Sequence, residues 1–298
     1  MKERYLNEIN IGEKIEISLM VIKILSRDEG TLTAYIGDKT KEVKAIINDE
    51  DKKISVGQVI KTKGTYDNIY KAEILEIIED FDLRDYVASV KRPIEDIMNE
   101  LEELTSDKFK SLEVIALNNY FFKDEKFLER FKKAIGGVYQ HHNYLGGLAE
   151  HTLGVTYLAK VFADRYNCRY KEIAILGAKL HDIGKIKEMN YDGPFTYSLE
   201  GEMEGHIVIG VTMVEEAFRA EPELYTHEFK ERIKGIIVQH HGKLEYGSPK
   251  TMKSQESYIV HYADYIDATM NKIDIVIDGV EKGSWTSYER RMEGKIFV

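Results

Sequence analysis

The hydrophobic periodicity of the chain changes once, near residue 81, and this change limits the folds that the chain can adopt. Between about residues 12 and 80, apolar side chains alternate with polar ones, as in the runs that begin at Ile15, Leu32 and Val43. After residue 81 the apolar positions recur at the spacing of helices instead. We therefore expect an all-β part followed by an all-α part.

The N-terminal part is predicted to contain five short strands. The candidate strands are 15–21, 32–36, 43–47, 59–66 and 70–78, with turn signals at Gly37-Asp38 and Asp67-Asn68. Five short strands in so short a stretch are typical of a small closed barrel, and the OB-fold is the five-stranded barrel that commonly binds oligonucleotides. SH3-like barrels have a similar number of strands, so the strand pattern leaves that alternative open.

Helical spacing extends over the rest of the chain. Residues 93–104 and 121–135 are predicted to form amphipathic helices, and Pro93 suits the start of the first one. The predicted fold class is therefore multi-domain, with a small all-β barrel before an all-α domain. The expected parts are an OB-like nucleic-acid-binding domain over residues 1–82, a helical connector over 83–135 and a helical domain over 136–298.

The composition argues against several classes of protein. The 298 residues are 43% hydrophobic, which supports a buried core and argues against disorder. The first ten residues carry charges where a secretory signal needs an apolar run, and no segment approaches the roughly 20 apolar residues of a membrane span. We expect a cytoplasmic protein without a membrane partner. The net charge of −10 argues against a broad basic surface for nucleic acid, but bound cations could supply positive charge in a narrow channel.

All nine histidines lie between residues 141 and 261, and several occupy the apolar faces of predicted helices. His151, for example, is spaced from Val155 and Phe162 so that its imidazole faces the interior. The same placement applies to His181 with Asp182, His206, His240 and Asp264. A single inward-facing histidine is usually a hydrogen-bonded core residue, but burying several imidazoles and carboxylates together is costly unless they bind a cation. The pattern therefore predicts a shared metal site.

The predicted ligands also restrict the metal. Imidazoles mixed with carboxylates suit Mn²⁺, Fe²⁺ or Zn²⁺ better than Ca²⁺, which prefers oxygen ligands alone. The single cysteine, Cys168, has no histidine partner at motif spacing, so a thiolate site is not expected.

The segments around these histidines resemble a known family. His151, His181-Asp182 in the string LHDIGK, and Asp264 resemble the H…HD…D signature of HD-domain phosphohydrolases, and His206 with His240-His241 is similar to the additional histidines of their two-metal members. More narrowly, HHNYLGGLAEHT (141–152), LHDIGKI (180–186), YSLEGEMEGHI (197–207) and QHHGKLEYGSPK (239–250) resemble the YhaM-type 3′-to-5′ exoribonucleases. That family joins an N-terminal OB-fold to an HD domain, so the resemblance covers nearly the whole chain.

The resemblance implies a ligand set for two metal ions. One metal would be held by His151, His181, Asp182 and Asp264, and Asp182 would bridge to a second one held by His206 and His240, with His241 as a further candidate. Two divalent cations could activate a water and clamp the oxygens of an in-line phosphoryl transfer. Mn²⁺ is the first candidate, and Fe²⁺, Zn²⁺, Co²⁺ and Mg²⁺ are alternatives. Asp182 and Lys185 would then be the catalytic residues, with Lys185 neutralising charge on the phosphate.

Other residues are candidates for binding substrate. His142 precedes the first ligand helix, and Lys243, Tyr246 and Lys250 lie in the string GKLEYGSPK, where the tyrosine could stack on a base. For all four, a place in an ordinary loop or behind the ligands is the alternative. In the predicted barrel, Tyr35, Tyr66 and Tyr70 lie near several lysines, a mixture that single-strand binders use.

Together these observations predict an enzyme that hydrolyses single-stranded RNA, or DNA, from the 3′ end to nucleoside monophosphates. The polarity and the product follow from the resemblance alone. Two other functions stay open: an HD-type phosphohydrolase of nucleotides or cyclic dinucleotides, which needs no barrel, and a non-catalytic single-strand binding protein. The sequence also leaves open whether the chain forms a homo-oligomer.

Overall fold

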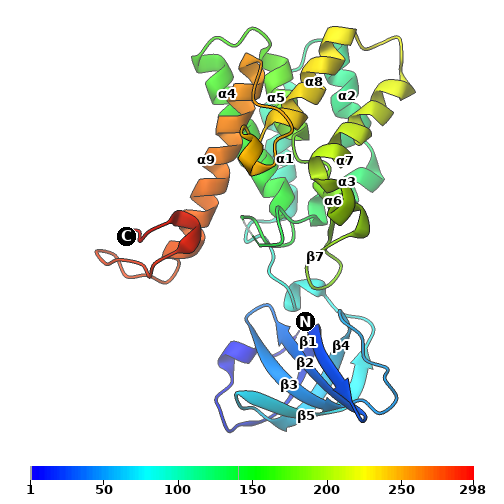
Figure 1. Ribbon diagram of the computed structural model, residues 1–298, viewed down its shortest axis with the longest axis vertical. Coiled ribbons are helices and arrows are strands. Elements are labelled where there is room, and N and C mark those ends of the chain that lie inside the picture. The colour runs from blue at the N-terminus through cyan, green and yellow to red at the C-terminus, as the bar shows by residue number, and fades with distance from the viewer. Residues whose placement is uncertain (1, 140) are drawn as a thin grey trace. The chain divides into compact units, whose positions relative to one another are not determined.

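The computed structural model describes residues 2–139 and 141–298, which form two compact units (Figure 1). The first unit comprises Met1–Ser89 and Asn190–Thr196, and the second comprises Val90–Met189 and Tyr197–Val298. The helices predicted for the connector therefore belong to the same compact unit as the histidine-rich part of the chain.

The first unit contains a closed barrel of five strands. The strands are β1 (Lys14–Asp28), β2 (Thr31–Asp38), β3 (Lys41–Asn48), β4 (Val59–Thr65) and β5 (Ile69–Ile78), with short 3-10 helices η1 (Leu6–Glu8) and η2 (Leu83–Asp85). Their order around the barrel is β1-β2-β3-β5-β4, and β1 closes it by pairing with β4. Only the β3–β5 pair in this barrel is parallel. The prediction of an OB-like barrel is confirmed.

The apolar and polar residues that alternate in the sequence point alternately into the barrel core and out to solvent. Ile15, Ile17 and Leu19 of β1 point into the core, because successive side chains of a strand face opposite sides. Tyr66 and Tyr70 also lie in this core, with 3% and 0% of their surface exposed. The prediction that these two tyrosines are available for stacking on bases was therefore wrong.

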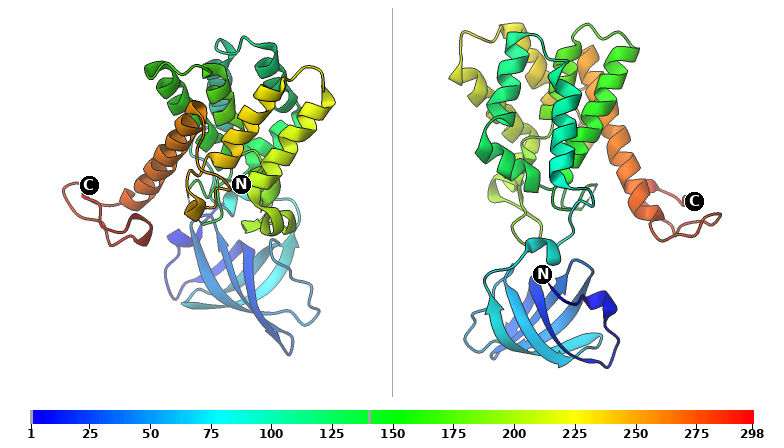
Figure 2. Two further views of the ribbon diagram at one scale, coloured as in Figure 1. Left: turned by 45° about the horizontal axis from the view of Figure 1, so that its top comes forward. Right: turned by 180° about the vertical axis from the view of Figure 1, so that it is seen from behind.

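The second unit is helical (Figure 2). Its elements are α1 (Ile94–Ser106), α2 (Leu112–Phe122), α3 (Glu125–Lys133), α4 (Gly147–Arg165), α5 (Lys171–Leu180), α6 (Lys185–Glu188), α7 (Leu199–Ala220), α8 (His227–Gln239) and α9 (Gln255–Ile277), with β6 (Met189–Asn190), β7 (Thr196–Tyr197), η3 (Leu244–Tyr246) and η4 (Arg290–Met292). Helix α5 lies at the centre and packs against α4, α8 and α9. None of the helices in the described part of the chain is both long and apolar enough to cross a membrane.

The prediction of one helix over residues 121–135 was wrong at its start. Helix α2 ends at Phe122 and a separate helix, α3, begins at Glu125. Asp124 separates them, because its carboxylate accepts a hydrogen bond from the backbone N–H of Phe127 and so caps α3.

Helix α5 buries a lysine in the helical core. Lys179 is 1% exposed, and its ammonium donates to Asn118 Oδ1 at 2.7 Å and to Thr105 Oγ1 at 3.3 Å. The ammonium also lies 4.1 Å from the centre of the Phe122 ring. Because burial disfavours the charged form, the pKa of Lys179 falls from 10.5 to about 7.

We expect the wild-type chain to gain stability relative to a Lys179→Met variant as the pH rises from about 7 to 10.5. In this window the unfolded chain keeps a proton on Lys179 that the folded chain has released, so raising the pH favours the folded state. Thermal unfolding midpoints of both proteins across this range measure the effect. A difference between the two midpoints that stays constant with pH would contradict it.

Candidate metal centre

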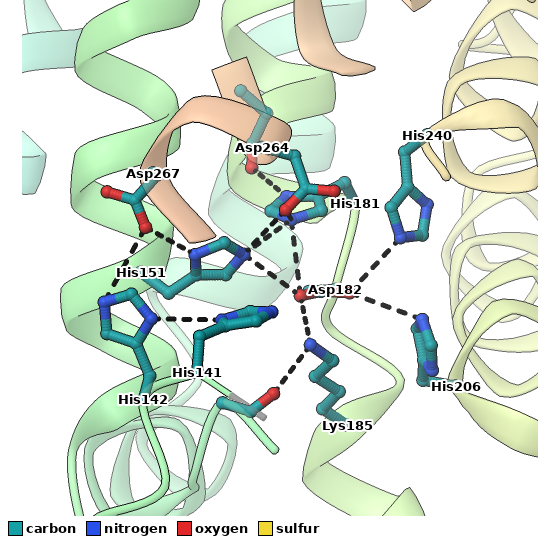
Figure 3. Close-up of polar contacts among 12 residues, drawn as sticks. His141, His142, His151, His181, Asp182, Lys185, His206, His240, Asp264 and Asp267 are labelled. Atoms are coloured by element: carbon teal, nitrogen blue, oxygen red, sulfur yellow. Dashed lines mark hydrogen bonds and ion pairs between the residues drawn. The ribbon is translucent and has the colours of Figure 1, made fainter. Parts of the chain in front are cut away.

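Five helices bring the predicted ligands together in one place (Figure 3). His151 lies on α4, His181 and Asp182 directly follow α5, His206 lies on α7, His240 directly follows α8, and Asp264 lies on α9. The imidazoles of His151, His181 and His240 are at most 1% exposed. Such burial of polar side chains calls for partners within the site.

One group of donor atoms surrounds His151 Nε2. This nitrogen lies 3.2 Å from His181 Nε2, 3.4 Å from Asp182 Oδ2 and 3.2 Å from Asp264 Oδ1. Ligands that share one cation at about 2.1 Å are separated from one another by distances of this size. Two imidazole nitrogens and two carboxylate oxygens are therefore placed to hold one divalent cation.

A second group surrounds the other oxygen of Asp182. His206 Nε2 and His240 Nε2 each lie 3.5 Å from Asp182 Oδ1. All three atoms are buried, and none has a hydrogen-bond partner among the described residues. Leaving a buried polar atom unpaired is costly, and here three such atoms converge. A divalent cation would satisfy all of them, so the donors present fit a second metal ion.

His241 lies beside this second group. One ring nitrogen from each of His206, His240 and His241 lies within 4.8 Å of the other two. His241 Nδ1 lies 2.8 Å from the backbone oxygen of Tyr246, which ties the 244–246 turn to the centre. His241 is thus close enough to add a ligand to the second group.

The ring nitrogens that face away from the centre fix the orientation of the imidazoles. His181 Nδ1 and His240 Nδ1 donate to backbone oxygens of Ala178 and Ile237, both at 2.7 Å. Donation from Nδ1 leaves the lone pair on Nε2, which is the atom that points into the centre.

Two carboxylates, which the sequence analysis did not identify, fix the orientation of the His151 and His206 imidazoles. His151 Nδ1 lies 2.7 Å from Asp267 Oδ2, and His206 Nδ1 lies 2.9 Å from Glu188 Oε1. Asp267 could have been found, because it follows Asp264 by three residues and so shares its helix face. Glu188 carries no such signal, since the fold alone brings it to His206.

A break in α7 sets the position of His206. Gly205 has a φ of 73° inside the helix, a left-handed conformation that glycine adopts readily. The backbone of His206 then passes so close to Gly184 that a Cβ at that position would lie 2.0 Å from the His206 oxygen. The glycine of the LHDIGK string is therefore required by this close approach.

The electrostatics of the centre keep both carboxylates ionised. Burial disfavours the charged form of Asp182, but the nearby Lys185 ammonium and the imidazoles outweigh it and hold its pKa well below the usual range. For Asp264, burial is likewise outweighed, mainly by hydrogen bonding with His151, so its pKa is also lowered. Ionised carboxylates are the form that binds cations.

Two imidazoles at the second group, those of His240 and His241, favour the neutral form. Burial lowers the pKa of His240, and burial together with neighbouring imidazoles lowers that of His241 to about 3. His151 differs, because three nearby carboxylates outweigh burial and raise its pKa well above the usual value. A cation bound by His151 would therefore displace a proton.

Lys185 is held inside the centre rather than in solvent. Its ammonium lies 2.7 Å from Asp182 Oδ2 and donates to the backbone oxygen of Gly136 at 2.7 Å. Only 7% of its surface is exposed. Although burial disfavours the charged ammonium, the charge of Asp182 raises the pKa of Lys185 overall.

The structure separates the predicted substrate-binding residues into two kinds. His142 is buried in the loop before α4, and its Nε2 lies 3.6 Å from Asp267 Oδ2, behind His151. Lys243, Tyr246 and Lys250 are exposed, and the Lys243 ammonium lies 5.3 Å from the centre of the Tyr246 ring. The three exposed side chains can contact a ligand in solvent, whereas the buried His142 cannot do so unless the loop rearranges.

The candidate metal ligands all lie within a segment that matches the model of a known protein family. Residues 148–269 match the family model of the HD domain, and every candidate ligand from His151 to Asp264 lies within that match. The chain carries an HD domain. HD domains belong to metal-dependent phosphohydrolases, which confirms the predicted enzyme class of metal-dependent hydrolase.

Similarity to curated proteins extends beyond the HD domain. The chain is 28% identical to the 3′-5′ exoribonuclease YhaM of Geobacillus sp. (strain WCH70), over 96% of this chain and 92% of that protein. It is 27% identical to the YhaM of Bacillus pumilus (strain SAFR-032), over 97% and 95%, and 26% identical to that of Bacillus subtilis (strain 168), over 96% and 95%. The predicted resemblance to the YhaM-type proteins is confirmed along nearly the whole chain.

Proposed function

We propose that this chain is a 3′-to-5′ exoribonuclease that releases nucleoside monophosphates from single-stranded RNA, with single-stranded DNA as a second substrate. The observation that carries the proposal is the convergence of two buried, unpaired imidazole nitrogens, of His206 and His240, on the equally unpaired Oδ1 of Asp182. This group lies next to the first set of ligands around His151. The OB-like barrel and the exoribonuclease names of the relatives support the class of substrate.

The proposed ligands follow the two sides of the Asp182 carboxylate. His151, His181, Asp182 and Asp264 would hold one cation, and Asp182, His206 and His240 would hold a second, with His241 as a further ligand. We take Mn²⁺ as the physiological ion, because mixed imidazole and carboxylate ligands suit it. When bound, the cations supply a nucleophilic water at neutral pH and stabilise charge on the attacking and leaving oxygens.

The remaining residues act on the substrate around that centre. Lys185, buried beside Asp182, places a fixed positive charge where charge develops on the phosphate oxygens. Lys243 and Lys250 contact phosphates of the strand, and the exposed ring of Tyr246 stacks on a base near the 3′ end. His142 supports His151 from behind through Asp267.

A phosphohydrolase of mononucleotides or cyclic dinucleotides could use the same centre, but it would have no use for the barrel. The two functions are separated by giving one preparation of the protein four substrates with Mn²⁺: single-stranded RNA, single-stranded DNA, a nucleoside triphosphate and a cyclic dinucleotide. We expect RNA to be degraded fastest. Hydrolysis of the small substrates alone would overturn the exoribonuclease proposal.

We expect a Glu188→Gln variant to bind its second metal ion about 10- to 100-fold more weakly, because carboxylates behind metal-binding histidines fix their orientation and basicity. Binding at the first set of ligands should be unchanged, since His151 is oriented by Asp267 instead. Calorimetric titration of the metal-stripped protein with Mn²⁺ measures both affinities. Glu202→Gln, at an exposed position of α7, is the matched control. Equal weakening at both sites would contradict the assignment.

A further inference from the structure

Helix α9 is apolar on two opposite faces. Val260, Ala263 and Ala268 are buried within the domain. On the other side, Tyr258 and Tyr262 are 47% and 52% exposed. A contiguous exposed apolar face on a helix commonly marks a surface that another molecule covers. The outer face of α9 therefore calls for a partner that the domain itself does not supply.

This outer face runs the whole length of the helix. At 3.6 residues per turn, Tyr258, Tyr262, Ile266, Met270, Ile273 and Ile277 lie on one side of α9, and no charged residue interrupts them. After Ala268 no residue of α9 is buried, although five of the last eight are apolar. In this last stretch, where α9 extends beyond the other helices (Figures 1 and 2), Met270 and Ile275 are 52% and 45% exposed.

A groove opens on the outer face near the start of α9. It has a volume of about 360 Å³ and lies between α9 and the end of α4, with Phe162, Tyr166 and Tyr258 in its wall. None of the residues that line it is charged. A ligand that carries phosphates would find no counter-charge there, whereas aromatic and aliphatic side chains would fit.

The chain itself contains a segment with exposed aromatic side chains, near its C-terminus. Residues 283–298 form a hairpin that closes on itself, with Thr286 N–H donating to the Ile296 oxygen at 2.9 Å. Its Trp285, Tyr288 and Phe297 are 59–65% exposed. Figures 1 and 2 place the hairpin beyond the C-terminal end of α9, clear of the rest of the helical unit.

The hairpin cannot occupy the groove of its own chain in this fold. Tyr262 and Ile277 are separated by about 22 Å along a continuous helix, at a rise of 1.5 Å per residue. The helix therefore holds the hairpin away from the groove. A second copy of the chain, running in the opposite direction, would bring its hairpin to the groove.

We propose that two copies of this chain associate through the outer faces of their α9 helices. The helices lie antiparallel about a two-fold axis near Met270, and the hairpin of each copy fills the groove of the other. Such an interface closes on itself and buries two grooves and two hairpins at once. Because this face carries no charged side chain, pairing two copies through it desolvates no charge and places no like charges opposite each other.

Sedimentation velocity of the full chain tests the interface. We expect the wild type to sediment as a dimer and Met270→Glu as a monomer, because the variant places two carboxylates at the two-fold axis. Leu112→Glu, at a position of α2 that is 74% exposed, is the matched control and should remain a dimer. Circular dichroism establishes that both variants are folded. A wild type that stays monomeric at the highest soluble concentration would overturn the proposal.

Cross-linking tests the arrangement of the two copies. Chains with Tyr262→Cys are mixed with chains with Trp285→Cys and treated with a short bismaleimide; the native Cys168 is buried and does not compete. We expect cross-linked pairs in the mixture and few in either variant alone. Equal cross-linking in the separate variants would contradict the antiparallel arrangement. A monomeric wild type in which Met270→Glu weakens RNA binding would instead make this face an RNA-binding surface.

Discussion

An Asp182→Ala variant is expected to lose phosphodiester hydrolysis by about 10³-fold or more while it remains folded. Each oxygen of this carboxylate faces a different group of donors, so the substitution removes one ligand from both proposed metal sites. Electrostatic stabilisation by a single group in an active site is often worth about 10²- to 10³-fold, and the loss of an ion costs more.

The same variant leaves Lys185 without its carboxylate partner in a buried place, so its fold must be checked by circular dichroism and thermal unfolding. Asp164→Ala, at an exposed position of α4, is the matched control for both stability and rate. Metal content by mass spectrometry supplies an independent readout. Near-normal turnover by a folded Asp182→Ala protein that still binds two ions would refute the bridging role.

Removal of the barrel is expected to weaken action on long single strands by about 10- to 100-fold and to leave a short model phosphodiester almost unaffected. The barrel is proposed to act by capturing the strand, and stacking of even one base contributes about 1–3 kcal/mol. A chain that begins at Val90 and the full chain are compared on both substrates by steady-state kinetics. Equal losses on the two substrates would mean that the barrel is structural.

The order of the two parts and most of the candidate ligands could be predicted because they depend on local periodicity. Period two gave the barrel strands, and helical spacing placed His151 and Asp264 on faces that prove to be buried together. The same reasoning did not foresee α2, because LEVIALNNYFF is apolar on most sides and shows little periodicity.

What the sequence could not give are contacts that only the tertiary fold creates. Glu188 reaches His206 across 18 positions of sequence, and the break at Gly205 that makes this contact has no periodic signal. Likewise, Tyr66 and Tyr70 resemble exposed stacking residues in sequence, yet the closure of the barrel buries both. Asp267, by contrast, could have been predicted from the sequence, because its spacing of three residues from Asp264 places both on one helix face.

The degradation pattern of an end-labelled RNA tests the proposed function most directly. A single-stranded RNA labelled at its 5′ end, incubated with the full chain and Mn²⁺, should shorten progressively from its 3′ end and stall near a duplex, because a barrel that binds unstacked bases excludes paired ones. The same RNA with its 3′ end closed in a hairpin should be protected. Equal cutting of the open and the closed RNA would contradict the proposed 3′-to-5′ exoribonuclease activity. Only the assignment to the HD-domain hydrolases would then remain.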